Sequence, residues 1–262
     1  MALVRDGDAQ GKANAAGALR NLMAVGDAAI KAAITAAGAI KALVALVRDG
    51  DAQGKANAAG ALQQLAVGDD AITVAIVAAG AIEPLVALVR DGDAPGKANA
   101  AFTLGSLAAR DDAIVAAITA AGAIEPLVAL VRDGDAEGKA NAARACQHLA
   151  AGDASCVALI AAAGKLVALL RDGDAQGKAY AAFTLGNMAA GDDAIKAAFV
   201  AAGAIEALVA LMCDGDALGQ ANAAATLRTL GMCSTIALTN GAHHAEVRHR
   251  VIVSDGVNYM QG

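Results

Sequence analysis

The sequence predicts an all-α protein, built as a right-handed α-solenoid of stacked helical repeats. Two observations support this: the chain is rich in alanine, the strongest helix former, and one segment recurs at a fixed spacing. Of the 262 residues, 57% are hydrophobic, only 2% are aromatic and three are proline. The scarcity of β-branched and aromatic residues disfavours a β-sandwich, and the apolar content argues against disorder.

The recurring segment has a period of 42 residues. It begins at Gly38 and returns at Gly80 and Gly122, whereas the copy at Gly164 is three residues shorter, because GAIEPLV has become GKLV. The aspartate of the central DGD motif therefore occurs six times, as Asp8, Asp51, Asp93, Asp135, Asp174 and Asp216. The predicted solenoid covers residues 1–241, divided into 1–37 (partial), 38–79, 80–121, 122–163, 164–202 (shortened) and 203–241 (divergent), and a divergent tail covers 242–262.

Each copy is predicted to form three helices. A short first helix is expected over Asp112–Ala121, ended by Gly122, because glycine readily takes the left-handed conformation at a helix end. The RDGD turn then ends the second helix, and Asp135 is placed to cap a third helix from about Ala136 to Ala150. The second helix carries one apolar stripe, formed by Ile124, Leu127, Leu130 and Val131.

The helix-breaking glycine, the AIxPLVxLV stretch and the DGDxxGKANAAxxLxxL stretch together resemble the armadillo repeat family over most of the chain. HEAT repeats are the alternative, but they use two helices and lack the glycine between the first two. The resemblance implies three-helix units whose third helices line a concave, partner-binding face. The expected function is a non-catalytic protein-interaction scaffold or adaptor. The alternative is a structural subunit of a larger assembly, with neighbouring proteins covering its uncapped ends.

The resemblance also implies candidate binding positions on that face. Peptide-binding relatives of the importin-α type carry a tryptophan on the third helix and an asparagine four residues later. In this chain the asparagine position holds Asn21, Gln64, Ser106, His148, Asn187 and Thr229, and the tryptophan position holds Gly17, Gly60, Phe102, Arg144, Phe183 and Ala225. With no tryptophan present, a long peptide clamp of the import-receptor kind is disfavoured.

Two further sets of residues could meet a partner protein. Phe102, Arg144 and Phe183 would form a row able to make apolar and cation–π contacts, unless both rings only fill gaps beside small neighbours. A lysine near the start of each third helix could meet an acidic partner, unless it is simply solvated beside the aspartates. The lysines chosen as candidates are Lys55, Lys97 and Lys139, with Lys12 and Lys178 in the same register.

Signals for other functions are weak. The net charge of −6 does not favour a nucleic-acid partner, and no P-loop or dinucleotide-binding motif is present. His148 is most simply a polar substitution on a repeat position, and the histidines of AHHAEVRH (242–249) lack a metal-binding spacing. We therefore expect no enzyme activity, no cofactor and no metal.

Targeting signals are equally weak. No transmembrane segment or secretory signal is expected, and the four cysteines show no disulfide or metal pattern, which favours an intracellular location without specifying an organelle. After Leu230 the repeat register is lost, and Val251–Val253 is expected to form a short strand.

Overall fold

A computed structural model describes residues 1–26, 28–67, 70–150, 156–190 and 193–232, without the side chains of 156–161. These residues form sixteen α-helices and no strand, so the predicted all-α solenoid of armadillo-type repeats is confirmed for them. The expected strand at Val251–Val253 and the tail 242–262 lie outside the described residues. The chain divides into two compact units, residues 1–155 and 156–262. The single solenoid over 1–241 stays a prediction.

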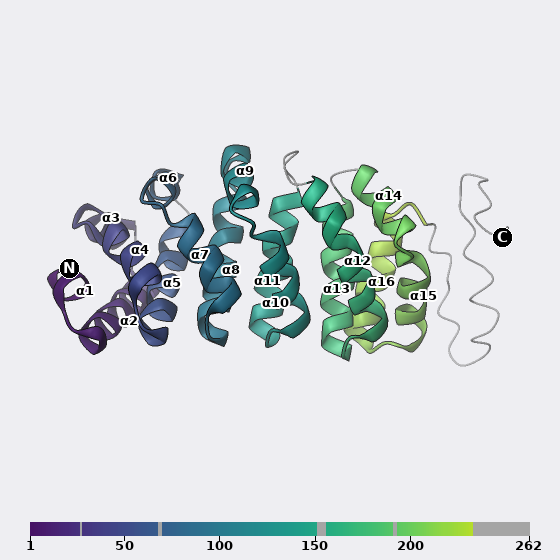
Figure 1. The fold of residues 1–262 in the computed structure, drawn as a ribbon, viewed down its shortest axis with the longest axis horizontal. Helices are drawn as coiled ribbons and strands as arrows, with labels where there is room; N and C mark the ends of the chain where they lie inside the picture. Colours follow the sequence, from purple (N-terminus) through teal and green to yellow (C-terminus); the bar gives the residue numbers. More distant parts are fainter. Residues whose placement is uncertain (27, 68–69, 151–155, 191–192, 233–262) are drawn as a thin grey trace. The chain divides into compact units, whose positions relative to one another are not determined.

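The first unit contains eleven helices in its described residues, arranged as repeats of three (Figure 1). The short first helices α3, α6 and α9 lie along the upper edge of the view, and the longer second and third helices lie below them. The third helices are packed side by side: α2 against α5, α5 against α8, and α8 against α11. The helices are α1 (Ala2–Asp6), α2 (Ala9–Val25), α3 (Ala28–Ala36), α4 (Ala39–Asp49), α5 (Ala52–Ala66), α6 (Asp70–Ala78), α7 (Ile82–Asp91), α8 (Ala94–Ala108), α9 (Asp112–Ala120), α10 (Ile124–Asp133) and α11 (Ala136–Ala150).

The second unit contains five helices in its described residues: α12 (Cys156–Asp172), α13 (Ala175–Ala189), α14 (Asp193–Ala201), α15 (Ala204–Asp214) and α16 (Ala217–Thr229). The expectation of three helices in every copy is wrong for the shortened one. Gly164 lies inside the continuous helix α12 and has no positive φ. The copy lacks the three residues that elsewhere complete the turn after the glycine, so the first and second helices join into one.

Where the turn is complete, the glycine acts as expected. Gly38, Gly80, Gly122 and Gly203 have φ between 73° and 81°, and the helices on either side cross at 73° to 79°. A β-carbon is strained in this left-handed region, which explains why glycine occupies it. Each first helix is thereby turned away from the second helix that follows it, and in the first unit α6 packs mainly on α5 and α9 mainly on α8, the third helices before them.

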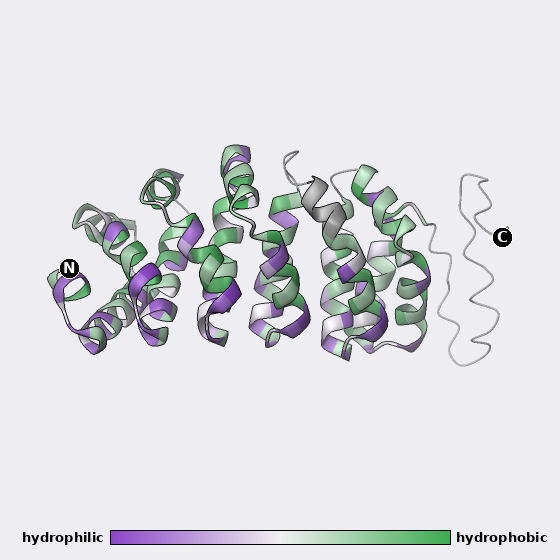
Figure 2. Ribbon diagram, viewed as in Figure 1, coloured by the Kyte–Doolittle hydropathy of each residue, from purple (hydrophilic) through white to green (hydrophobic). Residues whose placement is uncertain are grey.

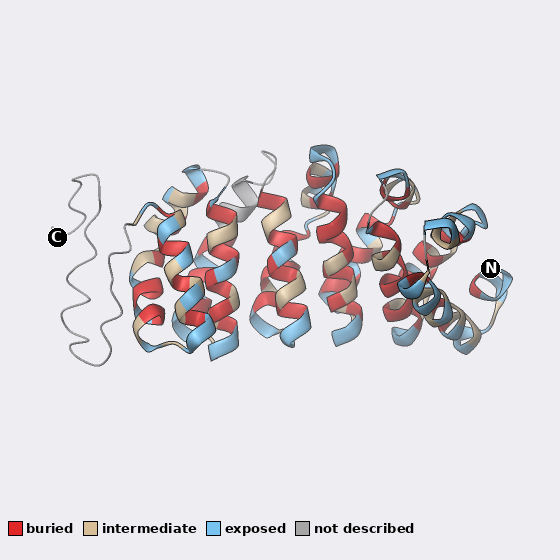
Figure 3. Ribbon diagram, turned by 180° about the vertical axis from the view of Figure 1, so that it is seen from behind, coloured by how far each residue is buried: buried red, intermediate tan, exposed pale blue. Residues whose placement is uncertain are grey.

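The RDGD turn joins the second and third helices. In the copy with Asp93, the carboxylate accepts a hydrogen bond of 2.9 Å from the backbone N–H of Gly96 and so caps α8. The preceding Gly92 leaves no room for a side chain, because a Cβ there would lie 2.5 Å from the carbonyl oxygen of Leu88. Figure 2 shows hydrophilic residues gathered at these turns, and Figure 3 shows the same lower edge exposed.

The third helices are tied together by an asparagine ladder that joins α5, α8, α11 and α16 each to the third helix before it, whereas Tyr180 holds this position on α13. The side-chain amide of Asn57 donates 2.9 Å to the carbonyl oxygen of Ala13, and that of Asn99 donates 3.0 Å to Ala56. Asn141 and Asn222 make the equivalent bonds to Ala98 and Ala179, at 3.1 and 2.9 Å. Alanine on the facing side lets the helices approach closely enough for these short side chains to reach across.

Candidate functional site

The sequence-predicted binding residues lie on the third helices, and two of them are in direct contact. The guanidinium carbon of Arg144 on α11 lies 4.3 Å from the ring centroid of Phe102 on α8. Arg144 is exposed and Phe102 is half-buried, so the stacked pair is open to solvent on one side. Such an exposed cation–π contact contributes about 0.5–1 kcal/mol. We call the side of α2, α5, α8 and α11 that presents this pair the third-helix face.

The asparagine-position residues of this unit differ in accessibility. Asn21 on α2 is exposed and Gln64 on α5 is half-buried, so both can donate to and accept from a partner. Ser106 on α8 is buried, and only 8% of it is exposed. The third-helix face therefore offers accessible polar side chains on α2 and α5, and the Phe102–Arg144 pair on α8 and α11.

His148 is half-buried and lines an open cavity of about 440 Å³ beside Arg110 and Asp111. Burial, with a smaller effect of the charge on Arg144, lowers the pKa of His148 below its ordinary value. Both effects favour the neutral imidazole. Arg110 itself forms an ion pair with Asp70 at 2.9 Å, which holds the end of α8 against α6.

Phe183 and Asn187 lie on α13, in the second unit. Phe183 is 38% exposed, and Asn187 is half-buried with its Nδ2 enclosed and without a hydrogen-bond partner in the described structure. Because the placement of α13 relative to α11 is not fixed, a continuous row of Phe102, Arg144 and Phe183 stays a prediction.

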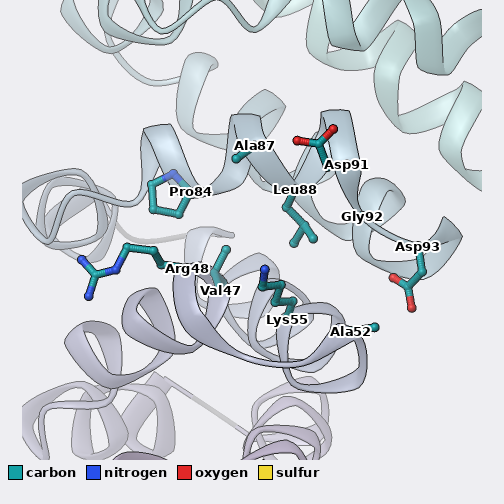
Figure 4. A pocket seen from close by; sticks show the side chains of 10 residues that line it. All are labelled: Val47, Arg48, Ala52, Lys55, Pro84, Ala87, Leu88, Asp91, Gly92 and Asp93. Carbon is teal, nitrogen blue, oxygen red and sulfur yellow. The ribbon is translucent and has the colours of Figure 1, made fainter.

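The candidate lysines lie elsewhere. Lys12, Lys55 and Lys97 each line one of three equivalent grooves at the RDGD turns, with cavity volumes of about 370, 280 and 250 Å³. Figure 4 shows the groove of Lys55, whose other wall is formed by α7 with Pro84 and Leu88. We call these the edge grooves.

The edge grooves are separate from the third-helix face. Lys55 and Gly60 are five residues apart on one helix, so their side-chain directions differ by about 140°. Aspartates surround the lysines: the pKa of Asp49 is lowered mainly by its hydrogen bonds from Arg48, with smaller effects of Lys55 and Lys12. Lys139 is only 3% exposed, so it is not an accessible contact residue.

Sequence reasoning missed two features of the third helices. One is the asparagine ladder, whose signal is the asparagine that recurs in KANAA and, in the last copy, in QANAA, with Tyr180 in its place on α13. The other is Arg20, whose stem lies over Gly60: a Cβ on Gly60 would be 2.7 Å from the Cδ of Arg20. A long side chain on one helix is thus accommodated by a glycine on the next.

The third helices carry positive charge although the chain as a whole is acidic. Within α2, α5, α8 and α11 there are six basic residues and one acidic residue, Glu137, which lies in the first turn of α11. On the third-helix face itself the charged side chains are Arg20 and Arg144. Both of these side chains are cationic.

Comparison with known proteins agrees with this architecture. The armadillo/beta-catenin-like repeat family matches residues 27–67. Computationally designed armadillo repeat proteins for modular peptide recognition are 30% identical, with a TM-score of 0.73 over 87% of this chain and 96% of theirs. The chain belongs to the armadillo repeat family.

Two further solved structures resemble this armadillo array. An engineered protein is 32% identical, with a TM-score of 0.76 over 87% of this chain and 95% of its own. A designed armadillo repeat protein in complex with the peptide (KR)4 is 27% identical, with a TM-score of 0.74 over 87% and 96%. The search of curated proteins found no match.

The described residues of the armadillo array show neither a metal-binding cluster nor a single helix able to span a membrane. They contain no group of three or more histidine, cysteine or acidic side chains placed to hold a metal ion. No single described helix has the length and apolar content to span a membrane, although four bent helix pairs meet that criterion by length and composition alone. Neither Cys146 nor Cys213 forms a disulfide, whereas the side chains of Cys156 and Cys233 lie outside the described residues.

Proposed function

We propose that the chain is a non-catalytic interaction scaffold that binds an extended, acidic segment of a partner protein on the third-helix face. The observation behind this proposal is the Phe102–Arg144 pair. Stacking on the ring restricts the guanidinium, while its N–H groups remain open to a carboxylate in bidentate geometry. Armadillo scaffolds are generally non-catalytic, which supports a binding role.

The charge of the face supports an acidic partner. The designed relative solved with (KR)4 is in complex with a basic peptide. Here the same peptide would bring its cations next to Arg20 and Arg144, a like-charge arrangement that disfavours binding. The net charge of −6 repels an acidic peptide from the molecule as a whole, so capture of such a peptide has to be local to this face.

The polar residues of the face support an extended peptide rather than a helix. Asn21 and Gln64 carry amides that can both donate to and accept from a peptide backbone. They lie on adjacent third helices, as Phe102 and Arg144 do, so one extended strand crossing the helices would meet polar groups first and the stacked pair next.

The test is a direct binding measurement with the peptides (DE)4 and (KR)4, each labelled with a fluorophore and followed by polarisation at about 0.1 M ionic strength. We expect (DE)4 to bind and (KR)4 not to bind. Arg144→Gln and Phe102→Ala should each weaken (DE)4 by about fivefold or more, in line with interface anchors.

The matched control is Lys97→Gln, which changes the charge by the same amount but lies in an edge groove. It should alter the affinity less than twofold, a limit of roughly 0.4 kcal/mol by the usual relation between affinity and free energy. Equal losses in Lys97→Gln and Arg144→Gln, or tighter binding of (KR)4, would contradict the proposal.

A structural subunit built into a larger assembly is the second candidate function. It is favoured by the exposed apolar residues at the first repeat, where Leu3 is 55% and Leu22 is 46% exposed. A pull-down at raised salt separates the two candidates, because binding through charge weakens with salt whereas a packed subunit is retained.

A further inference from the structure

The third helix α2 of the first unit and the third helix α16 of the second unit expose complementary halves of the interface that joins successive repeats. Leu22 on α2 is 46% exposed, but its equivalents Leu65, Leu107 and Leu149 are completely buried. Leu3 is 55% exposed, whereas its equivalents Leu46, Leu88 and Leu130 are 4–6% exposed. In each later repeat of the first unit, these positions are covered by the repeat before it. We call Leu3, Asn14, Gly17 and Leu22 the leading face.

The other half of the interface is exposed on α16. Ala13, Ala56, Ala98 and Ala179, whose carbonyl oxygens accept the asparagine ladder, are at most 3% exposed. Their equivalent on α16, Ala221, is exposed, and Ala224 is half-buried although its equivalents Ala16, Ala59, Ala101 and Ala182 are completely buried. We call Ala221, Ala224 and Arg228 the trailing face.

The side chains of the two faces also match in size. In the first unit, Arg20 on α2 lies over Gly60 of the next third helix. Of the six third helices, only α2 and α16 carry arginine at the position of Arg20, and the arginine on α16 is Arg228. Only α2 and α5 carry glycine at the facing position, as Gly17 and Gly60. Arg20 with Gly60 is one such pair, and Arg228 with Gly17 would be the other.

The ladder is open at the same places. Asn14 occupies the register of Asn57, and its side-chain oxygen accepts a bond from Gln10 within its own helix, at 3.0 Å. Asn57 accepts the equivalent bond from Gln53, at 3.2 Å, and in addition donates to Ala13 of the preceding repeat. Asn14 on the leading face and Ala221 on the trailing face are both exposed.

We propose that the chain associates head to tail, with the trailing face of one copy seated on the leading face of the next. In that contact Asn14 donates to Ala221 of the second copy, Arg228 of the second copy lies over Gly17, and Leu22 becomes buried. The two surfaces differ, so the contact is heterologous and produces a ring or an open filament rather than a closed two-fold dimer. This inference does not depend on the acidic-peptide proposal.

The test is analytical ultracentrifugation of the full chain over a range of concentrations. We expect the weight-average mass to rise with concentration beyond twice the 25.5 kDa of one chain. Leu22→Lys blocks the leading face and Arg228→Glu blocks the trailing face. Each variant alone should be monomeric, with its self-association weakened more than tenfold, because each removes one of the two matched contacts.

A mixture of the two variants decides the geometry. Each retains the face that the other has lost, so the equimolar mixture should form a dimer that does not grow further. The control is Leu218→Lys, which alters a 50% exposed leucine of α16 outside the trailing face and should associate like the unaltered chain. Far-UV circular dichroism checks that all variants remain helical.

Three results would overturn the proposal. A chain that is monomeric at every concentration shows that the faces do not pair. Loss of association in Leu22→Lys but not in Arg228→Glu indicates a contact between two leading faces. A mixture that stays monomeric rules out the pairing of leading with trailing face.

Discussion

The asparagine ladder gives a sharp test of how successive repeats are held together. The side chain of Asn57 is 8% exposed and donates 2.9 Å to the carbonyl oxygen of Ala13 on the preceding third helix. Asn14 occupies the same register in the first repeat, where the structure describes no preceding third helix, and it is exposed. Asn57→Ala removes a bond between repeats, and Asn14→Ala is its matched control.

The magnitude follows from the burial. A buried neutral hydrogen bond contributes about 0.5–1.5 kcal/mol net, and the lost packing of the amide adds to this. The carbonyl of Ala13 lies within α2 and keeps its helical hydrogen bonding, so no orphaned acceptor is created. We expect Asn57→Ala to lower the free energy of unfolding by about 1–2 kcal/mol, and Asn14→Ala to change it by less than about 0.5 kcal/mol.

Two measurements check this. Urea unfolding followed by far-UV circular dichroism gives the change in stability at constant slope. Amide hydrogen exchange of residues 9–25 gives its location, because weakening the tie between α2 and α5 should raise the exchange of α2 by about 5- to 30-fold. The exchange of α8 and α11 should change less, since they retain their own ladder bonds.

The reasoning fails if the two variants are indistinguishable in both measurements. It also fails if exchange in Asn57→Ala increases equally along the whole unit, because the ladder would then not be a local tie. The double variant should equal the sum of the single changes, since Asn14 and Asn57 share no partner.

Further predictions concern positions with distinct surroundings. Gly105→Ala should lower the free energy of unfolding, measured in urea, by about 1–3 kcal/mol, because the added Cβ would lie 3.0 Å from the Cα of Ala145. Gly164→Ala should raise the free energy of unfolding by about 0.5–1 kcal/mol, because the space around Gly164 is open. His148 has a lowered pKa in the folded state, so its contribution to stability is present above pH 6.5 and is lost as the pH falls below it; His148→Gln should flatten that part of the stability–pH curve. Burial raises the pKa of Cys146 to about 12, so iodoacetamide at pH 8 should label it only on unfolding, which mass spectrometry would detect. The opposite sign of either stability change in the glycine variants would contradict the first expectation. An unchanged dependence of stability on pH in His148→Gln would contradict the second, and rapid labelling of Cys146 in the folded protein would contradict the third.

Much of the fold was predictable because each repeat is built from local signals. The third helix expected from Ala136 to Ala150 has those bounds in the structure, and the aspartate caps follow from the DGD motif. The shortened copy was not predictable in the same way. Gly164 was expected to break a helix, but a glycine ends a helix only when the following residues provide the turn, and here those residues are missing.

The candidate site was less predictable, because exposure depends on neighbouring repeats. The repeat register places Phe102 beside Arg144, and the structure brings them into contact. The same register groups Lys139 with Lys55 and Lys97, yet Lys139 is buried. Helical spacing alone would have separated the lysines from the third-helix face, since five residues on a helix correspond to about 140°.

The asparagine ladder has a consequence for how such a chain can change its length. Every rung uses the same two groups, an asparagine amide and an alanine carbonyl, whichever repeats it joins. A duplicated or deleted repeat would therefore rejoin its neighbours through an interface that already exists. Unequal crossing-over within the gene could lengthen or shorten the protein in steps of one repeat, without inventing new core packing at the junction.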